Sequence, residues 1–228
     1  MFLAFPFSGT ITPLIFLGII PLLIVEASIS EQGKSSLNIF AHSLICFLVF
    51  NIGTSWWLWN ASAGGAIFAF LFNTVVMSLI FQAFHITKKH VGGKQGYLSL
   101  PFYWLGFEYL HNHWEFAHPW LSLGNTFSER VSWIQWYEYT GVSGGSLWVI
   151  LVNIIGYLVY KNWQHKKNLK PVVIVYFSSI IAPIAISFYI EARFNNGQQL
   201  LTSTRNIETL MIQPNIDPYN EKFDRGSF

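Results

Sequence analysis

The sequence predicts an all-α polytopic membrane protein, a bundle of transmembrane helices that leads into the start of a second, water-soluble domain. Hydrophobic residues make up 52% of the chain and charged residues 11%, whereas about 25% of the residues in an ordinary soluble domain are charged. Aromatic residues reach 18%, with ten Trp and ten Tyr, which is typical of a protein with many side chains at the bilayer interfaces. Beyond residue 207 the sequence becomes polar. A soluble globular protein is excluded, and we expect no nucleic-acid partner.

About six segments are apolar enough to cross the hydrocarbon core as helices, for which about 20 residues are needed. They lie near residues 5–25, 37–57, 62–85, 96–109, 144–160 and 171–190. The first contains Pro6, Pro13 and Pro21, so we expect a broken helix whose freed carbonyl groups are satisfied by neighbours. The fourth is short and contains Pro101, which favours a kinked or partly re-entrant helix.

Lysine residues indicate which end of the bundle faces the cytoplasm. Two connections, residues 87–95 and 161–170, hold lysines and no acid, namely Lys88, Lys89, Lys94, Lys161, Lys166, Lys167 and Lys170. The positive-inside rule places both in the cytoplasm. The 108–142 connection, with four Glu and only Arg130, is then exterior, together with residues 55–61 and the tail after Glu191, while 26–36 is a cytoplasmic loop. The amino terminus would also be exterior, so we expect an earlier span to precede it.

Polar and small residues inside the predicted spans have structural interpretations. We expect Asn73, Gln82 and Asn153 to join helices by hydrogen bonds. The pairs Gly64-Gly65 and Gly144-Gly145 should permit tight turns or close helix approach.

The exterior connection is the richest region, since loops of roughly 34 residues are usually functional. Its His111, His113 and His118, with Glu108 and Glu115, allow a metal site, but repeated histidine-rich boxes are missing. We therefore predict no metal and interpret these groups as interfacial hydrogen-bonding residues. Glu108 ends an apolar span, so it is either a functional acid or a carboxylate that reaches the interface. The cluster Trp56, Trp57 and Trp59 is an aromatic belt or, alternatively, a contact for lipid acyl chains.

These pieces, taken in order, resemble the bacterial apolipoprotein N-acyltransferases, over essentially the whole chain. The likeness rests on Leu3-Ala-Phe-Pro6, Gly53-Thr-Ser-Trp-Trp57, Phe107-Glu108-Tyr-Leu, His118-Pro-Trp-Leu-Ser-Leu-Gly124, Trp133-Ile-Gln135, Gly141, Gly144, Asn153 and Gln213-Pro-Asn-Ile216. The resemblance implies a membrane domain at residues 1–192. It also implies a linker and the first strand of a truncated α/β nitrilase-like (carbon-nitrogen hydrolase) domain at residues 193–228.

The family's activity is a two-step acyl transfer at the outer face of the bacterial inner membrane, without a cofactor. A cysteine thiolate, supported by a glutamate and a lysine, takes an acyl chain from a phospholipid and passes it to the N-terminal diacylglyceryl-cysteine of an apolipoprotein. Those three catalytic residues are expected beyond Phe228, and Cys46 inside a span cannot replace the nucleophile. We therefore expect the fragment to be inactive alone, monomeric and multi-pass among membrane lipids, with its tail in the periplasm.

The resemblance and the aromatic density of the exterior connection suggest substrate-contacting residues. We expect Glu108 to be among them, and Trp120, Trp133, Trp136 and Tyr137 to form the rim of a lateral opening for acyl chains. In the tail, Lys222-Phe223 stands where many family members have Lys-Trp, so a lipid contact is expected there too. About twenty residues cannot bury a core, so we expect the tail after Asn195 to pack loosely.

Two other functions are compatible with the composition. One is a transporter or channel subunit, and the other is a non-catalytic membrane scaffold that recruits a partner through the exterior connection. Against a transporter, the spans show no internal repeat and few charges, whereas transporters often build midplane sites from such features.

Overall fold

The computed structural model describes residues 1–6, 8–201 and 209–213. Its elements are η1 (Phe2–Ala4), η2 (Thr12–Leu17), α1 (Ile20–Glu31), α2 (Ser36–Ser55), α3 (Leu58–Ala61), α4 (Ala63–Val91), α5 (Gly93–Gly96), α6 (Ser99–His111), η3 (Pro119–Leu121), η4 (Leu123–Phe127), η5 (Val131–Trp133), α7 (Tyr137–Gln164) and α8 (Lys170–Leu201). No strand occurs in the described ranges, which confirms the all-α prediction there. Residues 209–213 form neither helix nor strand, and the nitrilase-like start stays a prediction.

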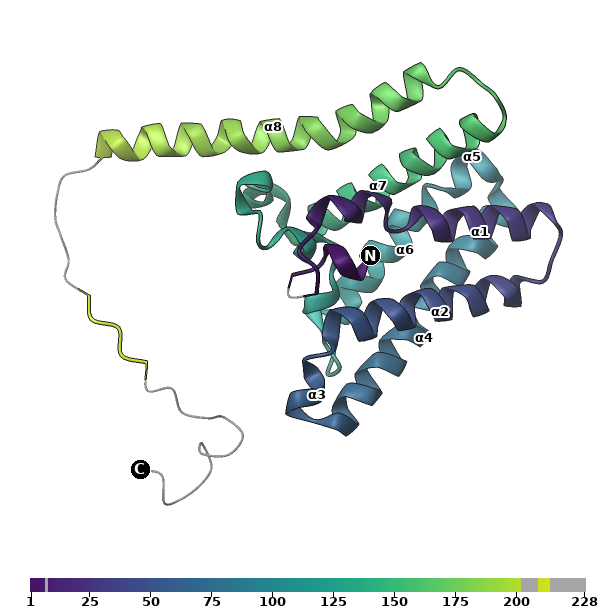
Figure 1. The fold of residues 1–228 in the computed structure, drawn as a ribbon, viewed down its shortest axis with the longest axis horizontal. Helices are drawn as coiled ribbons and strands as arrows, with labels where there is room; N and C mark the ends of the chain where they lie inside the picture. Colours follow the sequence, from purple (N-terminus) through teal and green to yellow (C-terminus); the bar gives the residue numbers. More distant parts are fainter. Residues whose placement is uncertain (7, 202–208, 214–228) are drawn as a thin grey trace.

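Five helical segments are long and apolar enough to cross a membrane, namely Thr12–Glu31, Ser36–Ser55, Ala63–Val91, Tyr137–Gln164 and Lys170–Asn195. The predicted fourth span is wrong as a full crossing, because α6 has 13 residues, about 20 Å of helix. Of the two forms expected for this segment, the kink is absent, since Pro101 lies in the first turn, where no intrahelical bond is lost, and the partly re-entrant helix stays a prediction. Even so, α6 leads the chain back from α5 towards the end of the bundle where α7 begins (Figure 1).

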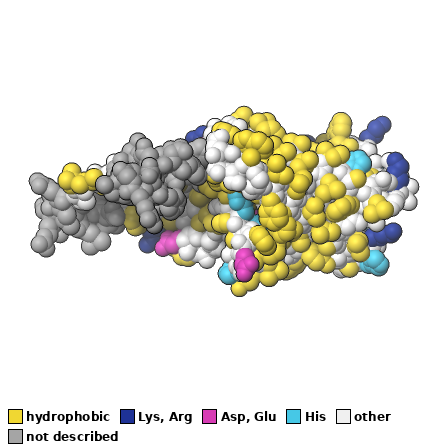
Figure 2. Space-filling model, turned by 90° about the horizontal axis from the view of Figure 1, so that it is seen from below, with side chains coloured by type: hydrophobic (Ala, Val, Ile, Leu, Met, Phe, Trp, Pro, Cys, Tyr) yellow, Lys and Arg dark blue, Asp and Glu magenta, His cyan; other side chains and the backbone are white. Residues whose placement is uncertain are grey.

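The helices α1, α2, α4, α6 and α7 form the bundle, while α8 lies along α7 at its edge (Figure 1). The core is aromatic. Its largest fully buried side chains include Phe5, Phe47, Phe50, Phe81, Phe84, Trp104 and Phe127. Figure 2 shows a broad hydrophobic surface on the outside, with Lys and Arg gathered at the right-hand end. That end holds the α1–α2, α4–α5 and α7–α8 connections (Figure 1), so the two lysine-rich connections do share one end, as predicted.

The first span is broken, and its freed backbone groups are satisfied by another helix, as predicted. Pro13 lies in the first turn of η2 and Pro21 in the first turn of α1. Between them, the Asn153 side chain accepts a hydrogen bond from the Ile19 backbone N–H (2.8 Å) and donates one to the Ile15 carbonyl (2.9 Å). Asn153 therefore joins α7 to the break. Asn73, by contrast, bonds to Ala69 of its own helix.

A close approach between η4 and α7 depends on glycine. A Cβ added at Gly145 would collide with the Tyr137 hydroxyl and would lie 3.0 Å from the Cα of Gly124. Gly141, with a φ of 65°, kinks α7 one turn earlier. The 144–145 pair thus permits close packing, as predicted. It brings onto α7 the exterior segment, as we call the connection at residues 108–142 after its predicted side of the membrane.

Candidate functional site

Glu108 lies in the last turn of α6, and its carboxylate binds groups inside the protein. The side chain is buried. Its Oε1 accepts hydrogen bonds from the Trp104 indole (3.0 Å) and from the Leu123 backbone N–H (2.9 Å). A buried carboxylate needs such donors. Here the donors attach the start of η4 to α6, so Glu108 fixes the path of the exterior segment.

A second set of hydrogen bonds joins the same segment to α7. The Gly124 N–H donates to the Ser146 hydroxyl (2.9 Å), and the Tyr137 hydroxyl donates to the Gly124 carbonyl (2.9 Å). Both polar groups of the Gly124 backbone are therefore paired with α7 side chains. Together with Glu108, these contacts hold η4 between α6 and α7.

The four predicted rim residues separate into two groups. Trp133, Trp136 and Tyr137 are half-buried against the core, and the Trp136 ring lies 4.8 Å from that of Tyr137. The intervening Gln135 N–H donates to the Ser187 hydroxyl of α8. Trp120 lies instead against Trp57, with ring centroids 6.4 Å apart, next to the junction of α2 and α3.

An apolar cavity of about 270 Å³ lies on the Trp120 side, between α3, the first half of α4 and residues 116–118. Its lining includes Leu58, Ala61, Gly65, Phe68, Ala69, Phe72, Phe116 and His118. The centroid of the Phe72 ring lies 5.4 Å from that of Phe68 and 5.6 Å from that of Phe116. None of the predicted rim residues lines this cavity, and the sequence reasoning did not identify it. The spacing of four between Phe68 and Phe72 was the available signal, because it places both rings on one helix face.

The histidines of the exterior segment bind separate partners. His118 Nε2 lies 3.2 Å from the Ser55 hydroxyl, His111 Nδ1 accepts from the Trp114 indole (2.9 Å), and His113 contacts the Tyr109 carbonyl. Burial lowers the pKa of His118. Burial, helped by His118, lowers the pKa of His111 to about 4. Among the described residues, no three His, Cys, Asp or Glu side chains gather as metal ligands would.

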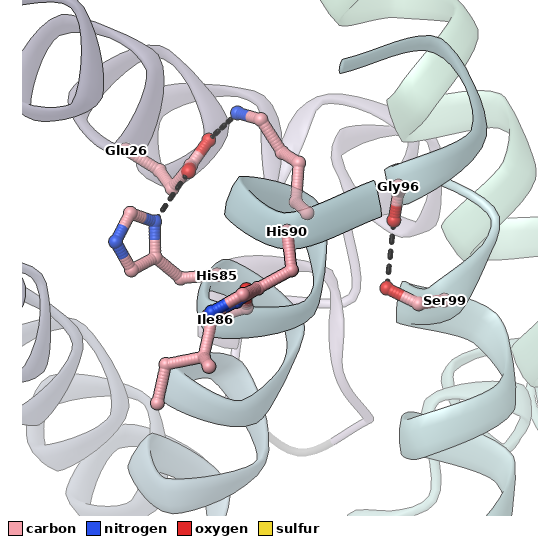
Figure 3. Close-up of polar contacts among 7 residues, drawn as sticks. Glu26, His85, Ile86, His90, Gly96 and Ser99 are labelled. Carbon is pink, nitrogen blue, oxygen red and sulfur yellow. Dashed lines mark hydrogen bonds and ion pairs between the residues drawn. The ribbon is translucent and has the colours of Figure 1, made fainter. Parts of the chain in front are cut away.

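A buried ionic cluster at the opposite end of the bundle was missed by the sequence reasoning. Glu26 was assigned to a cytoplasmic loop, but α1 continues through it to Glu31, and the Glu26 side chain is fully buried. Figure 3 shows its carboxylate between the His85 ring, at 2.7 Å, and a lysine ammonium, that of Lys88. Lys88 was also assigned to a loop, whereas α4 extends to Val91. Paired in this way, the buried acid and base compensate each other's charge inside the bundle.

Two predicted lipid contacts, Lys222 and Phe223, lie outside the described residues. In the described part of the chain, the exposed large hydrophobic side chains nearest to them in sequence are Leu210, Met211 and Ile212.

Comparison with known proteins identifies the family. The model of the apolipoprotein N-acyltransferase N-terminal domain matches residues 1–155. The apolipoprotein N-acyltransferase of Chlorobaculum tepidum is 27% identical over 212 residues, which cover 93% of this chain and 38% of that protein. The chain thus spans well under half the length of this relative. No solved structure matches. Because the family model covers more than half of the sequence, the chain belongs to the apolipoprotein N-acyltransferase family.

Proposed function

We propose that this chain is the membrane part of an enzyme that transfers a phospholipid acyl chain to the N-terminal diacylglyceryl-cysteine of lipoproteins. The observation that carries the proposal is the apolar cavity beside the exterior segment, in a chain whose family is named for acyl transfer to apolipoproteins. The cavity lies at the end of the bundle opposite the lysine-rich connections, and the positive-inside rule predicts that this end faces the exterior.

The cavity has the chemistry that an acyl chain requires. Its walls are mainly Phe, Ala and Leu side chains, and three polar residues, Ser62, Asn73 and His118, also line it. Apolar walls can accept a hydrocarbon chain from the bilayer without burying polar groups that lack partners, and about 300 Å³ is the lower limit for ligand pockets in proteins. A cavity of about 270 Å³ therefore suits part of one acyl chain.

Glu108 and the four aromatic residues have distinct roles in the proposal. Glu108 orients η4 from inside the protein and has no need to touch lipid. Trp133, Trp136 and Tyr137 form one side of the acyl entrance next to α8. Trp120 forms the other side, beside Trp57 and the cavity. Lys222 and Phe223 would contact lipid in the same exterior region.

A chimera tests the function. Residues 1–213 of this chain are joined to the part of the Chlorobaculum tepidum relative that follows the aligned segment. The purified chimera is then supplied with a phospholipid carrying a labelled acyl chain and with a diacylglyceryl lipopeptide. We expect labelled N-acylated lipopeptide from the chimera and none from the 228-residue chain alone.

The intact relative, assayed in parallel, shows that the conditions support transfer. A chimera that inserts into membranes and resists aggregation like the intact relative, yet forms no product, would contradict the proposal. Product from the 228-residue chain alone would contradict the assignment of the catalytic residues to a region beyond Phe228.

A further inference from the structure

A second cavity, of about 290 Å³, lies at the lysine-rich end between α1, α4, α5 and α7. Its lining includes three lysines, Lys88, Lys89 and Lys161, one acid, Glu31, and the rings of Tyr97 and Tyr157. A smaller cavity of about 140 Å³ shares Glu31, Tyr157 and Lys161 with it. The cavity that suits an acyl chain lies at the other end of the bundle, so these cationic cavities form a separate site.

The lysines of the second cavity differ in how much of their charge is free. The Lys88 ammonium pairs with Glu26 and lies 4.6 Å from the centre of the Tyr97 ring. Its charge is therefore already compensated. Lys89 and Lys161 have no ion-pair partner among the described residues, and they face a single carboxylate, that of Glu31. The free lining charge is positive.

The buried Glu26 neutralises Lys88 without adding a carboxylate to the cavity wall. It is fully buried, it is absent from the cavity wall, and its second oxygen binds His85. The negative charge that compensates Lys88 is thus outside the cavity wall. The wall presents the ammonium groups of Lys89 and Lys161, two phenol rings and the single carboxylate of Glu31. Ammonium groups bind phosphate oxygens through charge-assisted hydrogen bonds.

We propose that this cavity binds the phosphate group of an anionic phospholipid, with Lys89 and Lys161 as its cationic ligands. Basic pockets between transmembrane helices on the cytoplasmic side are suited to phospholipid head groups, and the lysine distribution predicts that this end faces the cytoplasm. The apolar outer surface of the bundle continues directly from this end (Figure 2), so the acyl chains of the same lipid have a surface to lie against. The site is independent of acyl transfer.

Binding can be measured on the 228-residue chain in a neutral detergent by native mass spectrometry. Phosphatidylglycerol is the probe, and a diacylglycerol with the same acyl chains is the phosphate-free control. We expect phosphatidylglycerol to bind at least tenfold more tightly. Each of Lys89→Gln and Lys161→Gln should weaken binding roughly fivefold, since one lysine near anionic lipid is worth about 1 kcal/mol.

Two further variants separate a specific site from general charge. Glu31→Gln removes the single lining carboxylate and should strengthen binding several-fold, a gain that misfolding cannot produce. The matched control Lys167→Gln/Lys170→Gln removes two exposed lysines at the same end that do not line the cavity, and should leave binding within about twofold.

Three results would overturn the proposal. They are equal binding of diacylglycerol, no weakening in the Lys89→Gln/Lys161→Gln variant, or an equal loss in the Lys167→Gln/Lys170→Gln control. Inorganic phosphate distinguishes the sources of the ligand. If millimolar phosphate displaces the lipid, the site also binds the free ion. If the lipid still binds in a lysine-dependent way in the presence of phosphate, the ligand of the site is the lipid head group. Both of these outcomes support the proposal.

Discussion

The side-chain oxygen of Asn153, in α7, accepts the backbone N–H of Ile19, at 2.8 Å, where the first span is interrupted. The same side chain donates to the Ile15 carbonyl. Asn153→Leu would leave both backbone groups buried without a partner, at about 1–3 kcal/mol each. We expect the free energy of unfolding, measured by SDS titration in mixed micelles, to fall by about 2–6 kcal/mol.

Asn73→Leu is the matched control for that prediction. Asn73 is also buried in a span, but its amide donates to Ala69 of the same helix and its oxygen has no hydrogen-bond partner among the described residues. Leucine there should change the free energy of unfolding by less than about 1 kcal/mol. An equal loss in both variants would show that Asn153 has no special role at the break.

The pair Glu26 and Lys88 should be strongly coupled. Glu26→Leu leaves the Lys88 ammonium buried without its counter-charge, and breaking a buried pair in this way costs about 3–5 kcal/mol. The double variant Glu26→Leu/Lys88→Met removes both charges, so it should be more stable than Glu26→Leu. A double-mutant cycle measures the coupling, and additive effects of the two substitutions would contradict it.

Gly145→Ala should separate η4 from α7. The new methyl group would collide with the Tyr137 hydroxyl, and overpacking of this kind typically costs about 1–3 kcal/mol. Removing the hydroxyl, in Gly145→Ala/Tyr137→Phe, should recover part of the loss. Gly64→Ala, where a Cβ meets nothing within 4 Å, should leave the SDS midpoint unchanged. No recovery in the double variant would argue against the contact.

Acid should destabilise the exterior segment through its histidines. Burial lowers the pKa of His118 below 6.5, and burial together with His118 lowers that of His111 to about 4. Below pH 6.5 the unfolded chain therefore takes up protons that the folded chain does not. Stability should be fully present above about pH 6.5 and decrease as the pH falls towards about 4.

The test of that pH dependence is the SDS midpoint at several pH values. His111→Gln removes one of the two groups and should flatten the dependence between pH 6.5 and 4. His165→Gln changes an exposed histidine at the lysine-rich end and should leave the dependence as it is. A steep dependence that survives both His111→Gln and His118→Gln would assign it to other groups.

Filling the apolar cavity should reduce acyl transfer by the chimera. Ala69 lines the cavity on α4, and Ala69→Phe would occupy space that the proposed acyl chain needs. We expect kcat/KM for the phospholipid to fall by roughly tenfold, the cost of about 1.4 kcal/mol of lost binding. Ala63→Phe, on an exposed position outside the cavity wall, is the control. Equal activity in both variants would exclude the cavity from lipid binding.

The sequence predicted the features of the fold that follow from single residues, namely the break in the first span and the close packing at the glycine pair. Pro13 and Pro21 interrupt the first span because proline lacks an N–H wherever it occurs. The Gly144-Gly145 pair indicated close packing because glycine has no Cβ, which is again a property of the residue itself. The position of Glu26 could not be predicted in this way. Its partners His85 and Lys88 are 59 and 62 residues away, and without them an acid at the end of an apolar run predicts a loop.

The sequence also led to a wrong prediction for the fourth span and gave no prediction of the apolar cavity. Apolar composition suggested a crossing near residues 96–109, but the run is short, and the helix that forms there, from Ser99 to His111, has only 13 residues. In the cavity, Phe68 and Phe72 follow a helical spacing, whereas Phe116 reaches them from the exterior segment. The path of that segment is set by the carboxylate of Glu108, a long-range contact that no spacing rule contains.

Helix α8 has a consequence for how the chain assembles. In its most apolar stretch, 6% of the residues are buried, and directional contacts hold it, such as the bond from the Trp148 indole to the Ser179 carbonyl (2.7 Å). Helix association in a bilayer depends on packing and interhelical hydrogen bonds and not on apolar burial from water. The position of α8 against α7 therefore rests on a small number of directional contacts, and most of its surface is left for lipid acyl chains.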